Sequence, residues 1–310
     1  LGPQNLFRVS RSSHSIGGSF GAAAAAACVL RLKDEQVRYV LSYTAQQVSG
    51  VLYWVRDVEH VEKAFVFGGM PARNGVTAAI LVQSGFTGVR EPFSGENNFF
   101  EANSPEPRPG LLVDGLGRRY EIVFTNIKKF SVGSPIQAAA DALLLLMDKY
   151  RFTAKDVQSV VARLPSGGAR IVNNRDMPDI NLQYILAVGL LDGDLTFQAA
   201  HSYPRMNDPA VLELKKRINL VEDPELSDAR ATRQGIVEVT TRDGARVREH
   251  VVHVRGTAEN PMSTAEVEKK CRELLTPVLG EERSQKLITM IWNLEQVSNV
   301  RQLRRLLSVP

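Results

Sequence analysis

The sequence predicts an α+β fold, in which a mainly helical domain contains an inserted, smaller α+β domain with an antiparallel sheet. Residues 19–115 and 261–310 show helical periodicity, whereas residues 120–255 mix helical segments with strand-like alternation. This order indicates that the mixed segment is inserted between two parts of one helical domain. We therefore expect three parts: a helical domain, truncated at its N-terminus, at 1–117, an α+β domain at 118–260, and C-terminal helices at 261–310 that return to the helical domain.

The first helical region contains an unbroken alanine run, Ala22–Ala27. Alanine has high helix propensity and a side chain too small to bury much apolar area, so this helix is suited to close approach by a neighbouring backbone. A following helical stretch is interrupted at Ser49-Gly50, and a third helix ends near Gly85. Three prolines at 105, 107 and 109 mark the end of the region, and the first ten residues show no helix start.

In the mixed region, the strongest pattern is a β-hairpin at residues 235–256, where alternating valines flank a two-residue turn at Asp243-Gly244. Capping-box spacing at Ser263 and Glu266 then begins the C-terminal helices. The remaining patterns predict strands at 119–130 and 157–164, helices at 134–150 and 178–193, and a helix running into a strand at 208–221.

Composition excludes several functional classes. The 310 residues carry a formal net charge of +4, with no long basic run of the kind that binds nucleic acid. This mild excess fits small anionic substrates. The only cysteines, Cys28 and Cys271, are far apart, which predicts neither a metal site nor a disulfide framework and favours a reducing, cytoplasmic location. No apolar run reaches membrane-spanning length, so we expect no membrane partner.

His14 precedes the alanine helix and a glycine pair, Gly17-Gly18. The free amide groups of a helix N-terminus favour negative charge, so His14 could be an acid/base residue at the edge of an anion pocket. The alternative is a packed internal helix with a histidine that happens to precede it. The residues alone favour this second interpretation.

Six segments, in this order, resemble the MmgE/PrpD family, whose best known activity is that of 2-methylcitrate dehydratase. The resemblance covers nearly the whole chain. The segments are HSIGGSFGAAAAAACVLRL, QQVSGVLYW, EKAFVFGGMPARNGVTAAILVQSGFTG, NIKKF with IQAAADALL, LQYILAVGLLDG, and ENPMSTAEVEKKCRELLTPVLG.

The resemblance implies a mainly helical domain with a smaller α+β domain, and a homodimer. It implies lyase chemistry on a small polycarboxylate without cofactor or metal: dehydration of 2-methylcitrate, decarboxylation of cis-aconitate, or epimerisation of iminodisuccinate. Each reaction moves a proton at a carbon beside carboxylates, so the site needs an acid/base group and several cations.

The resemblance also implies site residues. His14 matches an active-site histidine, Lys63 a lysine and Tyr184 a tyrosine, so these three are the predicted catalytic residues. The predicted substrate-binding residues are Lys128, Arg73 and Ser49.

The sequence departs from the family pattern at three places. A histidine expected shortly after the lysine is absent, with Phe67 in this stretch, and the run before Gly75 differs from the family pattern by one residue in length. Gln137 stands where a second histidine is common. The resemblance further leads us to expect that a long N-terminal helical segment, which in the family carries an aspartate and a histidine of the site, is missing here. We therefore keep a second hypothesis, a catalytically incomplete fragment or a non-catalytic polycarboxylate-binding protein.

Overall fold

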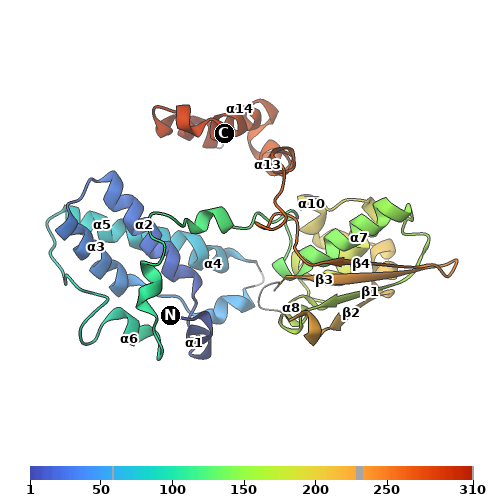
Figure 1. Cartoon of the computed structure of the whole chain (residues 1–310). Coiled ribbons are helices and arrows are strands. Elements are labelled where there is room, and N and C mark those ends of the chain that lie inside the picture. Colours follow the sequence, from blue (N-terminus) through green and yellow to red (C-terminus); the bar gives the residue numbers. More distant parts are fainter. Residues whose placement is uncertain (58, 228–232, 309–310) are drawn as a thin grey trace. The chain divides into compact units, whose positions relative to one another are not determined.

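The structure, a computed structural model, describes residues 1–57, 59–227 and 233–308 (Figure 1). The chain forms two compact units, Leu1–Arg119 and Tyr120–Pro310. The first is helical, and the second combines helices with a four-stranded sheet, so the predicted α+β class is confirmed. The predicted return of the last helices to the first domain stays a prediction.

The first unit is built from short and medium helices. The α-helices are α1 (Pro3–Arg8), α2 (His14–Val29), α3 (Asp34–Gln47), α4 (Val61–Ala64), α5 (Met70–Gln83) and α6 (Phe99–Asn103). Tighter or wider turns are η1 (Leu52–Arg56), the π-helical η2 (Phe65–Gly69) and η3 (Pro109–Leu112). No helix start is predicted before residue 10, yet α1 forms there with Pro3 in its first turn, where proline is favoured. The predicted break at Ser49-Gly50 is confirmed, because α3 ends at Gln47.

The first unit is centred on the contact between α2 and α5. A Cβ placed on Gly75 of α5 would lie 2.4 Å from the carbonyl oxygen of Ser19 and 2.5 Å from the amide nitrogen of Ala23. The two helix backbones therefore touch at this point. Ala23, Ala78 and Ala79 are buried beside it with no exposed area. The close approach predicted from the alanine run is confirmed.

The elements α4, η2 and α5 form one continuous helix, Val61–Gln83. By length and composition this helix could cross a membrane, although its Gly75 face packs on α2 as the face of a core helix does. It is longer than the sequence pattern predicts, because the π turn joins two segments whose patterns are separate.

The sheet of the second unit has the order β2-β1-β3-β4, with β1 (Val157–Leu164), β2 (Ile218–Glu222), β3 (Gly235–Thr241) and β4 (Arg246–Val251). The pairs β1–β3 and β3–β4 are antiparallel, but β1 and β2 are parallel. The sheet is therefore mixed, and the purely antiparallel expectation is wrong for β2. The helices between β1 and β2 form the crossover that a parallel pair requires.

The predicted hairpin is confirmed with a longer turn. Thr241 donates its amide to the carbonyl of Ala245 at 2.9 Å, and Gly244 adopts φ +89°. Four residues, 242–245, connect the strands.

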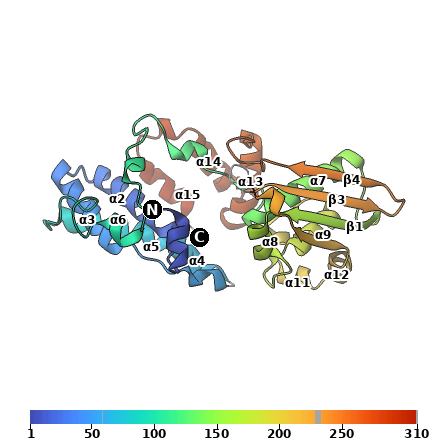
Figure 2. The same ribbon diagram turned by 60° about the horizontal axis from the view of Figure 1, so that its bottom comes forward.

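Helices cover the sheet and extend beyond it (Figure 2). α7 packs against β3 and β4, and α9 against β2, and α7 and α9 contact each other. The α-helices are α7 (Gln137–Tyr150), α8 (Ser166–Val172), α9 (Leu182–Asp192), α10 (Phe197–Ala200), α11 (Tyr203–Met206), α12 (Pro209–Lys215), α13 (Thr264–Leu279), α14 (Glu281–Trp292) and α15 (Leu303–Leu307). The 3-10 turns are η4 (Glu121–Phe124), η5 (Ser134–Ile136), η6 (Pro178–Ile180), η7 (Pro224–Leu226), η8 (Leu294–Gln296) and η9 (Val300–Gln302).

The strand predicted at 119–130 is wrong, because a 3-10 turn, η4, occupies residues 121–124. Ile122 and Val123 are 80% and 71% exposed, so the apolar alternation there buries no face. An alternating pattern stabilises a strand only when one face packs on a core.

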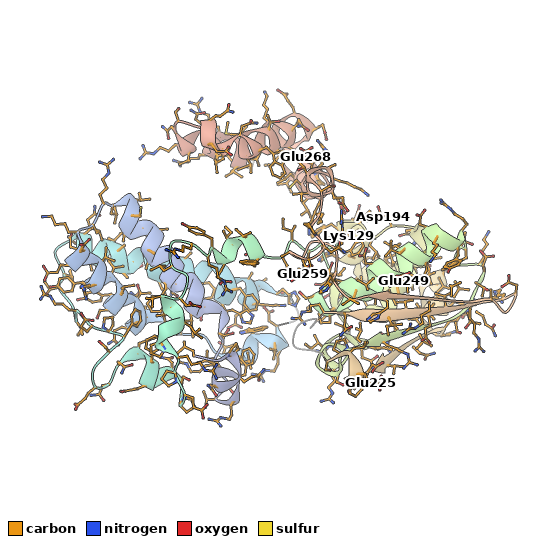
Figure 3. All side chains as sticks on the ribbon, viewed as in Figure 1. Lys129, Asp194, Glu225, Glu249, Glu259 and Glu268 are labelled. Carbon is orange, nitrogen blue, oxygen red and sulfur yellow. The ribbon has the colours of Figure 1, made fainter. Side chains whose placement is uncertain are left out.

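Polar contacts tie α13, the helix that carries Glu268 in Figure 3, to the rest of the second unit. Ser263 and Glu266 form the predicted capping box, which is confirmed. The guanidinium of Arg255 binds the Glu266 carboxylate with bonds of 2.6 and 3.0 Å. The Lys269 ammonium lies 3.2 Å from Asp194, which precedes α10. The start of this helix is therefore held by charge-assisted hydrogen bonds rather than by a buried apolar face.

We expect Gly75→Ala to destabilise the first unit by about 1–3 kcal/mol, because the added methyl group overlaps the α2 backbone, which cannot move away easily. Gly21→Ala is the matched control. Gly21 lies on α2, and no atom lies within 4 Å of the position that an added methyl group would take, so alanine there should be neutral or stabilising. Urea unfolding followed by circular dichroism measures both, and equal stability of the two variants would contradict the backbone contact.

We expect the contribution of Glu266 to stability to depend on pH. Hydrogen bonds from Arg255 and Ser263 lower the pKa of Glu266 from 4.5 to about 2. The carboxylate therefore stabilises the fold fully above pH 4.5, and this stabilisation is lost as the pH falls towards 2. Glu266→Gln should lower the melting temperature at pH 7. The difference in melting temperature between the original protein and this variant should become smaller below pH 4.5.

Glu268→Gln, on the same helix, is the control for this measurement. Its carboxylate contacts only Arg272 one turn away among the hydrogen bonds described, and such pairs between adjacent turns of a helix contribute little. If the melting-temperature difference caused by Glu266→Gln stayed constant across the pH range, the ionised Glu266 carboxylate would not be the source of the stabilisation.

Candidate functional site

His14 is placed by a contact between two turns of the first unit. The amide of Ser12 donates to the Gly50 carbonyl at 3.0 Å, and the amide of Leu52 donates to the Ser10 carbonyl at 2.8 Å. Gly50 has φ +132°, and a Cβ there would lie 2.8 Å from the Ser15 hydroxyl oxygen. Only glycine fits this crossing. The first turn of α2 is thereby brought against η1, which follows α3.

The imidazole of His14 lies on an aromatic pair. Its ring stacks on Phe67 with centroids 3.9 Å apart and planes 11° apart, and it meets the Trp54 ring edge-on at 5.3 Å. The hydroxyl of buried Ser12 accepts a hydrogen bond from Trp54 Nε1 at 3.2 Å and lies 3.4 Å from His14 Nδ1. The residue as a whole remains exposed. One ring face is therefore fixed by protein while the side chain stays accessible to solvent.

Lys63 extends its ammonium group over the same aromatic pair. Its Nζ lies 5.8 Å from the centroid of Trp54 and 5.8 Å from that of Phe67. The same atom is 3.5 Å from Nε2 of His60. The structure thus brings together His14 and Lys63, two of the predicted catalytic residues, in one cluster.

The environment of His14 sets its protonation state. Partial burial lowers the pKa of His14 below 6.5, and the positive charge of Lys63 lowers it further. Both causes disfavour the imidazolium form. At pH 7 the ring is therefore mostly neutral, and it can accept a proton or, in its minor protonated form, donate one.

Two predicted substrate-binding residues lie in the same unit. Arg73 is exposed on α5, where its guanidinium donates to the Asn74 side-chain oxygen at 3.2 and 3.0 Å and lies 5.6 Å from the Phe65 ring centroid. The Ser49 hydroxyl contacts the sulfur of Met70 at 3.7 Å. The Ser49 carbonyl accepts a hydrogen bond from Ser15, the neighbour of His14. Their predicted substrate-binding roles stay predictions.

Lys128 and Gln137 lie together in the second unit. The Lys128 ammonium donates to the Val132 carbonyl at 3.0 Å. Buried Gln137 accepts from the Phe130 amide at 3.2 Å and donates to the carbonyls of Phe130 and Val132 at 2.9 and 3.2 Å. The glutamine therefore stabilises the loop that precedes α7 by satisfying its backbone hydrogen bonds. Lys128 helps to hold the same loop, and its predicted role towards a carboxylate stays a prediction.

Tyr184 is buried on α9. Its hydroxyl donates to the Ala199 carbonyl at 2.5 Å and lies 3.3 Å from that of Ser202, and burial raises the pKa of Tyr184 to about 12. These are the contacts of a core tyrosine that stays protonated at neutral pH. Its predicted catalytic role stays a prediction, and the structure gives it a packing role.

The sequence reasoning missed four members of the cluster in the first unit. Ser12 and His60 lie outside the six segments, Trp54 ends one of them without being singled out, and Phe67 was noted only as a departure from a pattern. A usable signal existed for His60 alone, because it stands three residues before Lys63, a spacing that brings side chains together in a helical turn.

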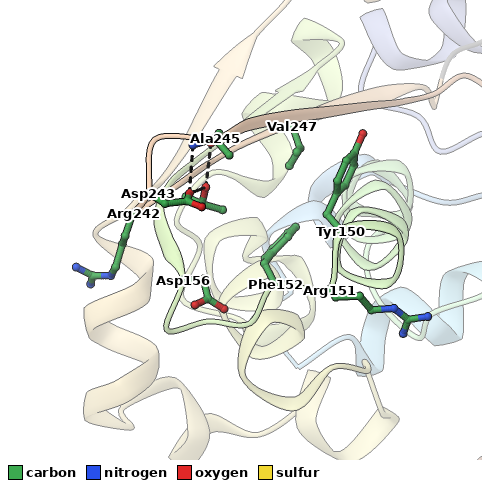
Figure 4. Close-up of a pocket in the computed structure, with 9 residues that line it drawn as sticks. Tyr150, Arg151, Phe152, Asp156, Arg242, Asp243, Ala245 and Val247 are labelled. Carbon is green, nitrogen blue, oxygen red and sulfur yellow. Dashed lines mark hydrogen bonds between the residues drawn. The ribbon is translucent and has the colours of Figure 1, made fainter.

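A pocket of about 490 Å³ lies at the hairpin end of the sheet and contains none of the predicted site residues (Figure 4). Its two carboxylates are bound locally: Asp156 accepts from Thr153, and Asp243 accepts from Thr241 and Ala245. In the described part of the chain, no group of three or more His, Cys, Asp or Glu side chains could hold a metal ion.

Comparison with known proteins agrees with the resemblance seen in the motifs. A mouse (Mus musculus) protein named "Cis-aconitate decarboxylase" is 26% identical over 313 residues, which cover 96% of this chain and 62% of the mouse protein. A protein of Aspergillus oryzae named "Cis-aconitate decarboxylase-like protein oryM" is 23% identical over 325 residues, covering 97% and 66%. The chain thus spans slightly less than two thirds of the length of these relatives.

Residues 1–111 match the MmgE/PrpD N-terminal domain, and residues 130–296 match the MmgE/PrpD C-terminal domain. The two matches follow each other along the chain in the order of their names and leave few residues outside them. The resemblance predicted from the motifs is therefore confirmed: this chain belongs to the MmgE/PrpD family.

Proposed function

We propose that this chain carries the site of a lyase that acts on a small polycarboxylate, and that the reaction is the decarboxylation of cis-aconitate. The observation that carries the proposal is the similarity to two relatives that are both named after this reaction. The cluster of His14 and Lys63 supports it, because it supplies an acid/base group beside a cation.

The chemistry of the substrate fits this pair. When a carboxylate of cis-aconitate leaves as carbon dioxide, its bonding electrons shift through the double bond, and a carbon atom must take up a proton. The imidazolium form of His14 can supply this proton, and the Lys63 ammonium can hold a remaining carboxylate as a point charge. Stacking on Phe67 fixes the imidazole plane, which reduces the reorganisation needed during proton transfer.

Dehydration of 2-methylcitrate and epimerisation of iminodisuccinate remain alternatives within the same class. Both begin with removal of a proton, which requires neutral His14 as a base. The direction of proton transfer therefore separates them from decarboxylation. A homodimer in the cytoplasm, expected from the resemblance and from the two separate cysteines, belongs to the same proposal.

A catalytically incomplete protein that binds polycarboxylates is the second candidate. The observation that favours it is that Phe67 and Gln137 stand where the family pattern has histidines. Loss of part of an acid/base set removes preorganisation and can leave binding intact.

We expect His14→Ala to lower kcat/KM for cis-aconitate by roughly 10²–10⁴-fold, because a positioned proton donor contributes about this much. His201→Ala is the matched control, since His201 is also exposed and stacked on a phenylalanine, Phe197, at 4.2 Å. It should retain the original rate. Carbon dioxide release measures turnover, with 2-methylcitrate, citrate and iminodisuccinate as parallel substrates.

The pH profile tests the direction of proton transfer. With His14 as donor, kcat/KM should fall as the pH rises through a pKa below 6.5, and His14→Ala should lack this limb. A rate that instead increases through the same pKa would assign His14 as a base and favour dehydration or epimerisation.

We expect millimolar cis-aconitate or citrate to raise the melting temperature, because a ligand that binds only the folded state stabilises it. Acetate at equal ionic strength is the control, and Lys63→Met should reduce the shift by removing a cation. A shift without turnover would favour the non-catalytic binding protein, and no shift with either tricarboxylate would contradict polycarboxylate binding.

A further inference from the structure

The family pattern predicts an imidazole shortly after Lys63, and this chain has Phe67 at that place. The Phe67 ring contacts the site itself, because the imidazole of His14 stacks on it. A different imidazole, that of His60, reaches the lysine from the other direction along the chain, with Nε2 3.5 Å from Lys63 Nζ. We propose that His60 is a positioning residue that holds the Lys63 ammonium over the Trp54–Phe67 pair beside His14. The functional meaning of this role rests on the proposed function.

The turn that carries His60 fixes its distance to Lys63. The Asp57 carboxylate accepts the backbone amides of Glu59 at 3.2 Å and of Lys63 at 2.9 Å, so it closes the turn between them. His60 itself adopts the left-handed conformation, with φ +58° and ψ +16°, at the N-cap of α4. Histidine is among the few non-glycine residues enriched in this conformation. The backbone thus aims both side chains to the same side of one helical turn.

A neutral imidazole suits the role better than a carboxylate. It can accept a hydrogen bond from the ammonium through Nε2 without cancelling its charge, so the positive charge stays available to a substrate carboxylate. The other charged groups of this turn are Arg56, Asp57, Glu59 and Glu62. Of the carboxylates, Asp57 is bound to backbone amides, and Glu62 hydrogen bonds to Tyr53 on η1.

The charge of Lys63 provides a readout that needs no substrate. Lys63 lowers the pKa of His14, and this effect depends on how close the ammonium is held. NMR titration of the His14 Cε1–H signal, assigned by its absence in His14→Ala, measures that pKa. Lys63→Met removes the positive charge, so we expect it to raise the pKa of His14, and the size of the rise measures the full effect of Lys63 on that pKa.

Two substitutions of His60 test whether its hydrogen-bond acceptor holds the Lys63 ammonium near His14. His60→Gly keeps a backbone that accepts positive φ but removes the acceptor, so we expect the pKa of His14 to rise nearly as far as in Lys63→Met. His60→Gln places an amide oxygen near the position of Nε2, so it should keep the original pKa. If the glycine variant melts below the assay temperature, His60→Asn, which tolerates positive φ and is too short to reach Lys63, takes its place.

Three results would overturn the proposal: an unchanged pKa of His14 in His60→Gly, an unchanged pKa in Lys63→Met, or equal shifts in His60→Gly and His60→Gln. The last would mean that the hydrogen-bond acceptor of His60 does not hold the lysine. Because no substrate is involved, the outcome is independent of turnover. A protein without lyase activity can still show the expected changes in the pKa of His14, and an active lyase can fail to show them.

Discussion

The site in the first unit depends on the direct contact between the backbones of α2 and α5. Gly75 removes the side chain that would separate them, and the buried alanines Ala23, Ala78 and Ala79 leave no bulk beside it. A second close contact, with a Gly18 Cβ position 3.1 Å from the Pro71 side chain, lies one turn nearer the start of α2. His14 begins α2, whereas Phe67 and Lys63 lie on the helix that continues into α5. The stacking distance between His14 and Phe67 is therefore set by how closely the two helices pack.

The sequence predicted the parts of the fold that depend on local chemistry. The alanine run, the capping box at Ser263 and the Asp243-Gly244 turn each specify structure within a few residues, and all three are found. The failures concern long-range pairing. No local pattern states that β1 and β2 lie side by side in parallel, because residues 165–217, which form helices and loops, separate them in the sequence. The apolar alternation at 119–130 resembled a strand because the pattern does not say whether a core covers it.

Prediction of the site was limited in the same way. The motif match pointed to His14 and Lys63, and they lie on the same aromatic pair. No motif indicated the contacts that Trp54 and Ser12 make with His14, because these contacts arise from the crossing of two turns. For Tyr184 the match identified the residue but not its burial, which follows from the packing of α9 against the rest of the second unit.

The π-helical turn at Phe65–Gly69 lies between the part of the helix that packs on α2 and the part that carries Lys63. A π turn holds more residues than an α-helical turn, so it changes the angle about the helix axis between Lys63 on its N-terminal side and Gly75 on its C-terminal side, compared with an unbroken α-helix. Lys63 and Phe67 are thereby directed towards His14 while Gly75 faces α2. The π turn therefore separates two tasks of one helix: residues after it pack on α2, and residues in it and before it surround the imidazole of His14. A change in the length of this turn would re-aim Lys63 and Phe67 and leave the backbone contact of α2 and α5 in place.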